Sequence, residues 1–303
     1  MYDVIIVGGG PAGLQAALTL GRMHKHALLL DSGAYRNGRV AHMHNFLTHD
    51  GTPPEKFRSE ARAELAAYPT VEIRDAAVGA VEKVGDTFRV ALGEEVLESR
   101  LVILATGVRD EMPAVPGLED LWGTHAYACP FCHGHELSGR PIGILAGPAA
   151  LHLVGLLAPI GSSVTVFSQG AELDAEQLAM LDRLGAVLRP EPVVGVSHAP
   201  EADEVAIALA DRTVNVAGLF VGTGRFVQSA PFADQLGLDL LDSGCIAIDD
   251  FGRTSLDGVF AAGDLAHRPA FPMPMASVLN AAAAGQLAAV ASVQQLLAAP
   301  PQK

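Results

Sequence analysis

The chain has 303 residues, of which 50% are hydrophobic and 18% are charged, a composition typical of a folded protein of about two domains. Acidic residues outnumber basic ones by 34 to 20, and the net charge of −14 disfavours binding to nucleic acid or to an anionic membrane surface. Three cysteines are too few for a disulfide-stabilised secreted scaffold. An apolar segment follows the first residues with no basic segment before it, so no signal peptide is predicted.

The N-terminal third predicts a dinucleotide-binding unit. Residues 2–7 form an apolar, β-branched run, the sequence GGGPAG follows, and an amphipathic stretch leads to a second apolar strand at 27–30. Strand, glycine turn, helix and strand in this order open a dinucleotide-binding fold. Short alternating strands within 71–94 predict a small antiparallel excursion, and a buried strand at 101–105 precedes a proline-containing linker at 110–117.

A second strand–helix–strand pattern follows. Strands are expected at 142–146 and 164–167, helices at 149–157 and 174–184, and further strands at 187–197, 204–209 and 213–221. We therefore predict an α/β fold of two dinucleotide-binding domains, with residues 113–226 inserted between the two parts of the first domain, 1–112 and 227–303. Two segments without acidic or basic residues, 141–171 and 269–302, are interpreted as buried parts of a soluble, cytoplasmic protein and not as membrane spans.

The glycine turn after the first strand points to a bound nucleotide. In G-x-G-x-x-G, Gly8 allows the tight turn, Gly10 lets the backbone approach a diphosphate, and Gly13 lets the helix pack on the strand. The diphosphate would lie at the helix N-terminus, where free N–H groups favour an anion. Asp31, at the end of the second strand, is placed to accept hydrogen bonds from a ribose.

Three segments in order, residues 8–13, 105–107 and 258–264, resemble the FAD-contacting segments of thioredoxin reductase-like flavoproteins. The resemblance extends over essentially the whole chain and implies bound FAD within a three-layer ββα fold. It implies that Asp264 binds the ribityl chain, that Ser277 and Val278 lie near flavin N1 and O2, and that Asn45 lies beside the flavin ring. The cofactor-binding residues predicted in this way are Gly8, Gly10, Pro11, Ala12, Gly13, Asp31, Ser32, Gly33, Arg36, Asn37, Asn45, Val78, Ala105, Thr106, Gly107, Gly263, Asp264, Ser277 and Val278.

Cys129-Pro130-Phe131-Cys132 is the second signal. A C-x-x-C at a helix start brings two thiols within bridging distance and lowers the thiolate pKa. Taken alone, the pattern also fits half of a zinc site, with His133 and His135 as further ligands, or two packed thiols. The resemblance implies a redox disulfide instead and no metal, with Cys132 facing flavin C4a and Cys129 exchanging with the substrate.

Position 133 separates subfamilies. Thioredoxin reductases usually carry an aspartate after the second cysteine, whereas this chain has His133. A histidine titrates near neutral pH, so it is predicted to deprotonate an incoming thiol or to hold the Cys132 proton; a solvated loop position is the alternative. His135 and Glu136 are weaker candidates for the same proton transfers. Outside this motif, Cys245 is expected to be a buried apolar residue.

The second dinucleotide unit lacks the residues that hold NADPH in a reductase. The turn after its first strand reads Ala146-Gly147-Pro148-Ala149-Ala150-Leu151, so alanine and proline replace the first two glycines, and Pro148 has no backbone donor. Ser168-Gln169-Gly170 follow the next strand, where an acidic residue or an arginine would bind the adenosine ribose or its phosphate. The sequence therefore predicts no functional NADPH site.

These features together resemble the small-molecule dithiol oxidases that close the intramolecular disulfides of holomycin, gliotoxin and romidepsin. The resemblance implies electron flow from a substrate dithiol through the Cys129–Cys132 disulfide and FAD to dioxygen, which gives hydrogen peroxide. Holomycin is the first candidate product, and a homodimer is expected. A protein disulfide reductase fed by NADPH or ferredoxin and a non-enzymatic flavin redox sensor are the alternatives. Trp122 and Tyr127 either line the substrate cleft or pack the domain.

Overall fold

The computed structural model describes residues 1–145, 147 and 151–298, and the chain divides into two compact units. The first unit contains residues 1–38, 54–110 and 225 onward, and the second contains residues 39–53 and 111–224. The boundaries expected after residues 112 and 226 each lie two residues from those of the units. The sequence did not indicate that residues 39–53, here called the strap, group with the second unit.

A mostly parallel sheet forms the centre of the first unit, with the spatial order β3-β2-β1-β6-β5-β4 and with β18 beside β6. Its strands are β1 (Tyr2–Val7), β2 (Ala27–Asp31), β3 (Val71–Asp75), β4 (Ala80–Val84), β5 (Thr87–Leu92), β6 (Glu95–Leu104) and β18 (Val259–Ala261). β1, β2, β3, β6 and β18 are parallel, whereas β4, β5 and β6 form an antiparallel meander. β6 is long enough to pair with β5 through its first half and with β18 through its second.

Both faces of β1 are covered. Val4 and Ile6 enter one hydrophobic core, and Ile5 and Val7 enter another on the opposite face of the sheet. The first core is completed by helices, and the second by the meander and the chain that follows β16. Because neither face of the strand meets water, the run has no polar alternation. The predicted three-layer ββα arrangement is confirmed.

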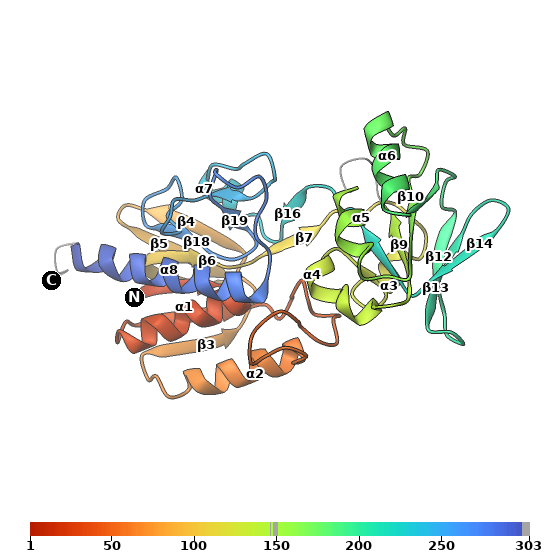
Figure 1. The fold of residues 1–303 in the computed structure, drawn as a ribbon. Coiled ribbons are helices and arrows are strands. Elements are labelled where there is room, and N and C mark those ends of the chain that lie inside the picture. The colour runs from red at the N-terminus through yellow and green to blue at the C-terminus, as the bar shows by residue number, and fades with distance from the viewer. Residues whose placement is uncertain (146, 148–150, 299–303) are drawn as a thin grey trace. The chain divides into compact units, whose positions relative to one another are not determined.

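The remaining elements of the first unit are α1 (Pro11–Arg22), α2 (Pro54–Leu65), β7 (Val108–Asp110), β16 (Phe226–Gln228), α7 (Phe232–Leu236), β17 (Ile246–Ala247), β19 (Ala266–His267) and α8 (Val278–Ala298). Figure 1 shows α8 alongside α1. A Cβ at Gly285 would lie 2.0 Å from the carbonyl oxygen of Ala12, so this close helix contact requires glycine. Among the described helices, α8 alone is long and apolar enough to span a membrane, but its packing against α1 is that of a core helix.

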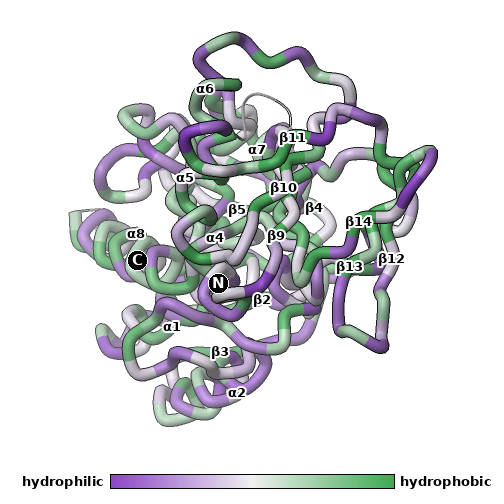
Figure 2. Tube along the Cα trace, turned by 45° about the vertical axis from the view of Figure 1, so that its right-hand side comes forward, coloured by the Kyte–Doolittle hydropathy of each residue, from purple (hydrophilic) through white to green (hydrophobic). Residues whose placement is uncertain are grey.

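The second unit is built on a parallel sheet with the order β11-β10-β9-β15-β8 and an antiparallel ribbon of β12, β13 and β14. Its elements are α3 (Leu118–Leu121), β8 (Ala126–Tyr127), α4 (Pro130–His133), a 3-10 helix η1 (His135–Leu137), β9 (Pro141–Leu145), α5 (His152–Leu157), β10 (Ser163–Phe167), α6 (Ala175–Arg183), β11 (Val187–Arg189), β12 (Gly195–Ala199), β13 (Glu204–Ala208), β14 (Thr213–Val216) and β15 (Gly218–Val221). Hydrophobic and hydrophilic residues alternate along the ribbon, as Figure 2 shows, because one face packs on the core.

The excursion expected at residues 71–94 is only partly antiparallel. β4 and β5 form the expected antiparallel pair, but β3 pairs in parallel with β2 at the edge of the main sheet. β3 lies at the edge of the sheet and is half exposed, so it can carry the charged residues Glu72 and Arg74. The resulting alternation of apolar and charged residues is also typical of an antiparallel strand, which explains the wrong prediction. The sequence analysis also missed α2, whose surface is mostly charged.

Candidate active site

The glycine turn has the geometry of a nucleotide cradle. Gly8 has a φ of +115°, and a Cβ there would lie 2.3 Å from the carbonyl oxygen of Ala105, while a Cβ on Gly13 would lie 1.8 Å from the carbonyl oxygen of Gly8. Gly10, in contrast, has no atom within 4 Å of an added Cβ. Gly10 is the N-cap of α1, with no side-chain cap and no acidic residue in the first turn. The helix N-terminus is thus open to an anion.

Asp31 is 3% exposed and supports the loop that follows β2. One carboxylate oxygen accepts the backbone N–H of Gly33 at 3.0 Å, and the other accepts the Tyr35 hydroxyl at 2.5 Å and the Arg62 guanidinium at 3.0 Å. A carboxylate has about four acceptor positions, so these contacts leave it one for a ribose hydroxyl. Burial, followed by the hydrogen bond to Asp31, raises the pKa of Tyr35 to about 12.

Two arginines of α2 support the same loop, and the sequence analysis missed both. Arg62 joins Asp31 to Asp75. Arg58 lies 3.8 Å from the ring centroid of Tyr35 and donates to Asn37 Oδ1 at 3.2 Å. Their spacing of four residues in one helix is the sequence signal that could have indicated a shared role.

Arg36 connects the third predicted FAD segment to the end of β7. Its guanidinium forms ion pairs with Asp264 at 3.0 Å and with Asp110 at 2.5 Å. Burial alone would lower the pKa of Arg36, but its hydrogen bonds to Asp110 and the charges of both carboxylates raise it. For Asp264 burial has the opposite effect and raises the pKa of the carboxyl group, while the positive charge of Arg36 partly opposes this increase. The predicted ribityl ligand therefore has a strong cationic partner beside it.

The other predicted cofactor residues of the first unit surround the same turn. Gly263 has a φ of +90°, and a Cβ there would lie 3.1 Å from the Cβ of Ala12, so the third segment packs directly on the start of α1. Gly107 has a φ of +67° next to Thr106. Ser277 precedes α8, and its hydroxyl accepts the Asn280 N–H. The glycine turn, the 105–107 segment and the 263–264 segment are thus brought together, as FAD binding requires.

Three predicted cofactor contacts stay predictions. Val278 is the first residue of α8, and Val78 packs against the meander-side core. Asn45 belongs to the strap of the second unit, where its φ is +61° and its backbone N–H donates to Asp50 at 2.7 Å.

Cys129 and Cys132 form a disulfide with a Cα–Cα distance of 5.3 Å. Cys129 is the N-cap of α4, and Pro130 occupies the first helical position, where its missing N–H costs nothing. Phe131, between the cysteines, is 68% exposed. The bonded sulfurs offer no thiolate to a metal, so the zinc alternative finds no support in this state. An exposed short helix that carries a disulfide can exchange with an incoming thiolate.

His133 is the last residue of α4, and its ring stacks on the ring of Tyr127 with the centroids 4.2 Å apart. Both ring nitrogens are buried and have no hydrogen-bond partner among the described residues. Burial lowers the pKa of His133 to about 4, which the nearby Glu136 only partly offsets. This corrects the near-neutral titration expected from the sequence. At neutral pH the imidazole is uncharged and has a free lone pair that can accept a proton.

The strap contacts α3 and η1, the turn that follows the redox helix. Arg39 donates to the carbonyl oxygens of Glu119 and Asp120 at 2.6 and 2.7 Å. His44 lies 3.5 Å from a carboxylate oxygen of Glu136. Glu136 is therefore an ion-pair partner of the strap. The sequence did not decide whether Tyr127 and Trp122 line a substrate cleft or pack the domain. In the structure Tyr127 stacks on His133, whereas Trp122 packs against the hydrophobic core beneath the β12–β14 ribbon.

The second dinucleotide turn falls mostly outside the described residues, which omit Ala146, Pro148, Ala149 and Ala150. The chain after β10 is described. Ser168 is buried, and Gln169 accepts the Val193 N–H through its side-chain oxygen at 3.0 Å. Neither side chain offers a carboxylate or a guanidinium to a nucleotide ribose.

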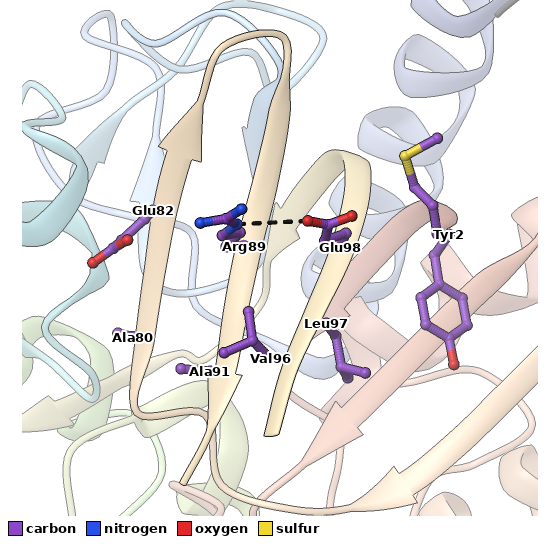
Figure 3. A pocket seen from close by; sticks show the side chains of 9 residues that line it. Tyr2, Ala80, Glu82, Arg89, Ala91, Val96, Leu97 and Glu98 are labelled. Carbon is purple, nitrogen blue, oxygen red and sulfur yellow. Dashed lines mark ion pairs between the residues drawn. The ribbon is translucent and has the colours of Figure 1, made fainter. Parts of the chain in front are cut away.

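The surface hollow drawn in Figure 3 has a volume of about 620 Å³ and lies on the outer face of the meander, beside Tyr2. Its charged residues Arg89 and Glu98 pair with each other across it at 3.5 Å. None of its lining residues belongs to the predicted FAD segments or to the redox helix.

Two dinucleotide-type units with a redox-capable disulfide define a disulfide oxidoreductase of the thioredoxin reductase-like class. The chain matches the pyridine nucleotide-disulphide oxidoreductases over residues 2–286, and it belongs to that family. It is 36% identical to thioredoxin reductase aclD of Aspergillus oryzae over 98% of this chain and 96% of that protein. It is 33% identical to thioredoxin reductase sirT of Leptosphaeria maculans over 88% of this chain and 87% of that protein.

A solved structure, that of HlmI, superposes with a TM-score of 0.90 at 35% identity and covers 98% of this chain and 93% of that one. Membership of the family implies flavin binding. The residues of the first unit fit FAD. They combine a helix N-terminus without a side-chain cap, open space beside the Cα atom of Gly10, and the Arg36–Asp264 pair.

Proposed function

We propose that this protein is an FAD-dependent dithiol oxidase that closes an intramolecular disulfide in a small-molecule dithiol, with dioxygen as the electron acceptor. The observation that carries the proposal is the Cys129–Cys132 disulfide on a short helix next to the neutral, buried and unpartnered imidazole of His133. A disulfide and a base are what thiol exchange needs, and a nicotinamide is not required when the substrate itself supplies the electrons.

The first step is attack of a substrate thiolate on the Cys129 sulfur. The bond between Cys129 and Cys132 breaks, a mixed disulfide forms between the substrate and Cys129, and Cys132 leaves as a thiolate. His133 accepts the proton of the incoming thiol, and the imidazolium is then stabilised by the thiolate that forms beside it. That charge offsets the burial that holds the pKa of the free histidine at about 4.

In the second step the other substrate thiol attacks the substrate sulfur that is bonded to Cys129. The bond to Cys129 breaks, and the proton of the attacking thiol passes to the Cys129 thiolate that leaves. The substrate leaves as a cyclic disulfide, and the two electrons remain on the cysteine pair. A bound FAD would supply the route by which these two electrons, with the two protons of the substrate thiols, reach dioxygen and give hydrogen peroxide. Phe131, exposed between the cysteines, offers apolar surface to a substrate that lies over the helix.

The lack of nucleotide determinants supports dioxygen over a nicotinamide. The chain has no arginine or lysine from residue 141 to residue 182, and Gln169 is engaged with Val193. The second candidate is a protein disulfide reductase fed by NADPH or ferredoxin, and the names of the relatives aclD and sirT favour it. We further propose a cytoplasmic homodimer with a holomycin-type dithiol as substrate, and no nucleic-acid or membrane partner. The acidic net charge supports the lack of a nucleic-acid or membrane partner.

Oxygen uptake and peroxide release with purified FAD-loaded protein test the proposal. Reduced holomycin and other reduced dithiol natural products are supplied without nicotinamide, and the proposal expects one dioxygen consumed for each disulfide formed. Oxidised thioredoxin with NADPH is the comparison substrate. Turnover of thioredoxin without oxygen uptake from any dithiol would establish the reductase instead.

A further inference from the structure

A cluster of metal-ligand side chains lies in the second unit, apart from the redox disulfide. Two histidines and one aspartate, His125, His198 and Asp203, place one potential ligand atom each within 4.8 Å of one another. They come from separate parts of the chain: the turn before β8, the middle of β12, and the loop between β12 and β13. The proposed dithiol chemistry uses none of the three.

The distances are close to those of a metal site. Asp203 Oδ1 lies 3.0 Å from His125 Nε2 and 3.3 Å from His198 Nε2. In a tetrahedral site with metal–ligand bonds of 2.0–2.2 Å, neighbouring ligand atoms lie about 3.3 Å apart. The two imidazole rings have centroids 4.3 Å apart, so both can turn toward one ion. The two distances to Asp203 are thus near those of bound geometry, and all three ligand atoms lie within 4.8 Å of one another.

The backbone around the three residues is held in place. The His125 carbonyl oxygen accepts the Leu219 N–H of β15 at 2.9 Å, and His198 lies within the β12–β13 ladder. Arg140 donates to the Asp203 carbonyl oxygen at 2.9 Å, which secures the loop that carries the carboxylate. Asp203 has a φ of +50°, a backbone conformation that aspartate tolerates better than most residues. A site fixed in this way loses little freedom when an ion binds.

The ligand set selects the class of ion. Two imidazoles and one carboxylate suit Zn²⁺ and similar divalent transition metals, whereas Mg²⁺ and Ca²⁺ prefer oxygen ligands throughout. Three protein ligands leave a fourth position for water or another small ligand, and the site is open to solvent.

We propose that His125, His198 and Asp203 form a binding site for Zn²⁺ or a similar divalent transition metal on the second unit. The site uses neither Cys129 nor Cys132 as a ligand, so an ion can bind while the redox pair is a disulfide. The alternative is that no ion binds there and that Asp203 only accepts hydrogen bonds from the two histidines.

The test is isothermal titration of untagged, FAD-loaded, air-oxidised protein with zinc sulfate. Oxidation matters, because the disulfide removes the two thiolates that would compete for the ion. One saturable site is expected in the wild type, and cobalt chloride is expected to give the visible bands of a tetrahedral ion. The variants H198A and D203N should weaken zinc binding at least about 10-fold. The matched control is E201Q, which removes an exposed acidic charge from the same loop and should bind zinc as the wild type does.

Flavin absorbance and melting temperature confirm that each variant is folded. Zinc should also raise the melting temperature of the wild type, since an ion that binds only the folded state stabilises it. The proposal is wrong if the wild type shows no saturable zinc site, or if H198A binds zinc as tightly as the wild type. Equal weakening in E201Q and D203N would contradict it as well, because it would show a response to acidic charge in general.

Discussion

The two units start from the same strand–turn–helix–strand plan and differ at the two points where a nucleotide would be held. In the first unit Gly13 packs against Gly8, the space before Gly10 is open, and Asp31 organises the loop after β2 through Gly33. In the second unit the loop after β10 carries Gln169, which uses its amide to hold Val193. The sequence of its turn contains alanine and proline where two glycines are expected.

On the proposed function, the second unit would keep the dinucleotide fold without holding a nucleotide. The parallel sheet of the second unit is intact, with β9 paired to β10 and to β15. Its hydrophobic alternation needs no nucleotide to be satisfied. What that unit contributes to the proposed chemistry is the redox helix and its buried histidine.

The largest expected effect is on turnover, and it comes from the cysteines of the second unit. C129S and C132S should each abolish dithiol oxidation, because the exchange needs a disulfide that one sulfur cannot form. C129S should show a long-wavelength absorbance band from a Cys132 thiolate next to the flavin, and C132S should lack it. C132S should instead form a mixed disulfide with the cyclic disulfide product, because the Cys129 thiolate attacks one sulfur of the product and the S–S bond of the product breaks. Absorbance spectra and mass spectrometry measure both; the band in C132S alone would reverse the two roles.

Replacement of the buried base should slow the enzyme without loss of its disulfide. H133A should reduce turnover by about 10²–10⁴-fold, the usual contribution of general acid–base catalysis. Activity should partly recover at higher pH, where substrate thiols ionise unaided. Oxygen uptake across a pH series measures this, with thiol titration to confirm that Cys129 and Cys132 are still bonded. A variant as fast as the wild type would show that His133 is not catalytic.

The same histidine should make stability depend on pH. Its pKa is about 4 in the folded protein and 6.5 when unperturbed. Between these values the unfolded chain binds a proton that the folded chain does not, so the free energy of unfolding should decrease as the pH falls from 6.5 toward 4. The two pKa values correspond to ~3 kcal/mol. Urea unfolding of wild type and H133Q at about pH 7 and about pH 4.5 isolates this contribution; equal pH dependence in the two proteins would contradict the burial of a neutral imidazole.

The smallest effect compares the two glycine turns directly. An added methyl group at Gly10 or at Gly147 meets no atom of the described residues beyond its chain neighbours within 4 Å, so neither substitution is expected to disturb folding. G10A should weaken FAD binding roughly 10-fold, because the methyl group would occupy the space where the diphosphate approaches the backbone. G147A should leave FAD binding unchanged. Fluorescence titration of the apoprotein with FAD measures both, and equal affinities for G10A and wild type would remove the glycine turn from the FAD site.

The sequence predicted the fold where local signals agree with each other. Buried strands such as residues 2–7 and the glycine turn after them combine periodicity, composition and position, and the structure confirms the ββα unit they predicted. Prediction was poorer where a segment depends on distant partners. The parallel edge position of β3 and the grouping of the strap with the second unit are set by contacts that no local pattern records.

The sequence predicted which residues form the candidate site better than it predicted their pKa values. The sequence indicated the cysteine pair and the histidine, but the pKa of His133 depends on burial against Tyr127, which is a property of packing. Arg58 and Arg62 were missed for the same reason, because they reach the Asp31 loop from a helix about 30 residues further along the chain.

Anaerobic mixing of the FAD-loaded protein tests the central claim most directly, since it asks which donor reduces the flavin. One sample receives dithiothreitol as a generic dithiol, and two others receive NADPH and NADH. We predict rapid loss of the flavin absorbance with the dithiol through Cys129 and Cys132, and no loss on a catalytic timescale with either nucleotide. Rapid bleaching by NADPH together with no response to the dithiol would contradict the account and establish the reductase.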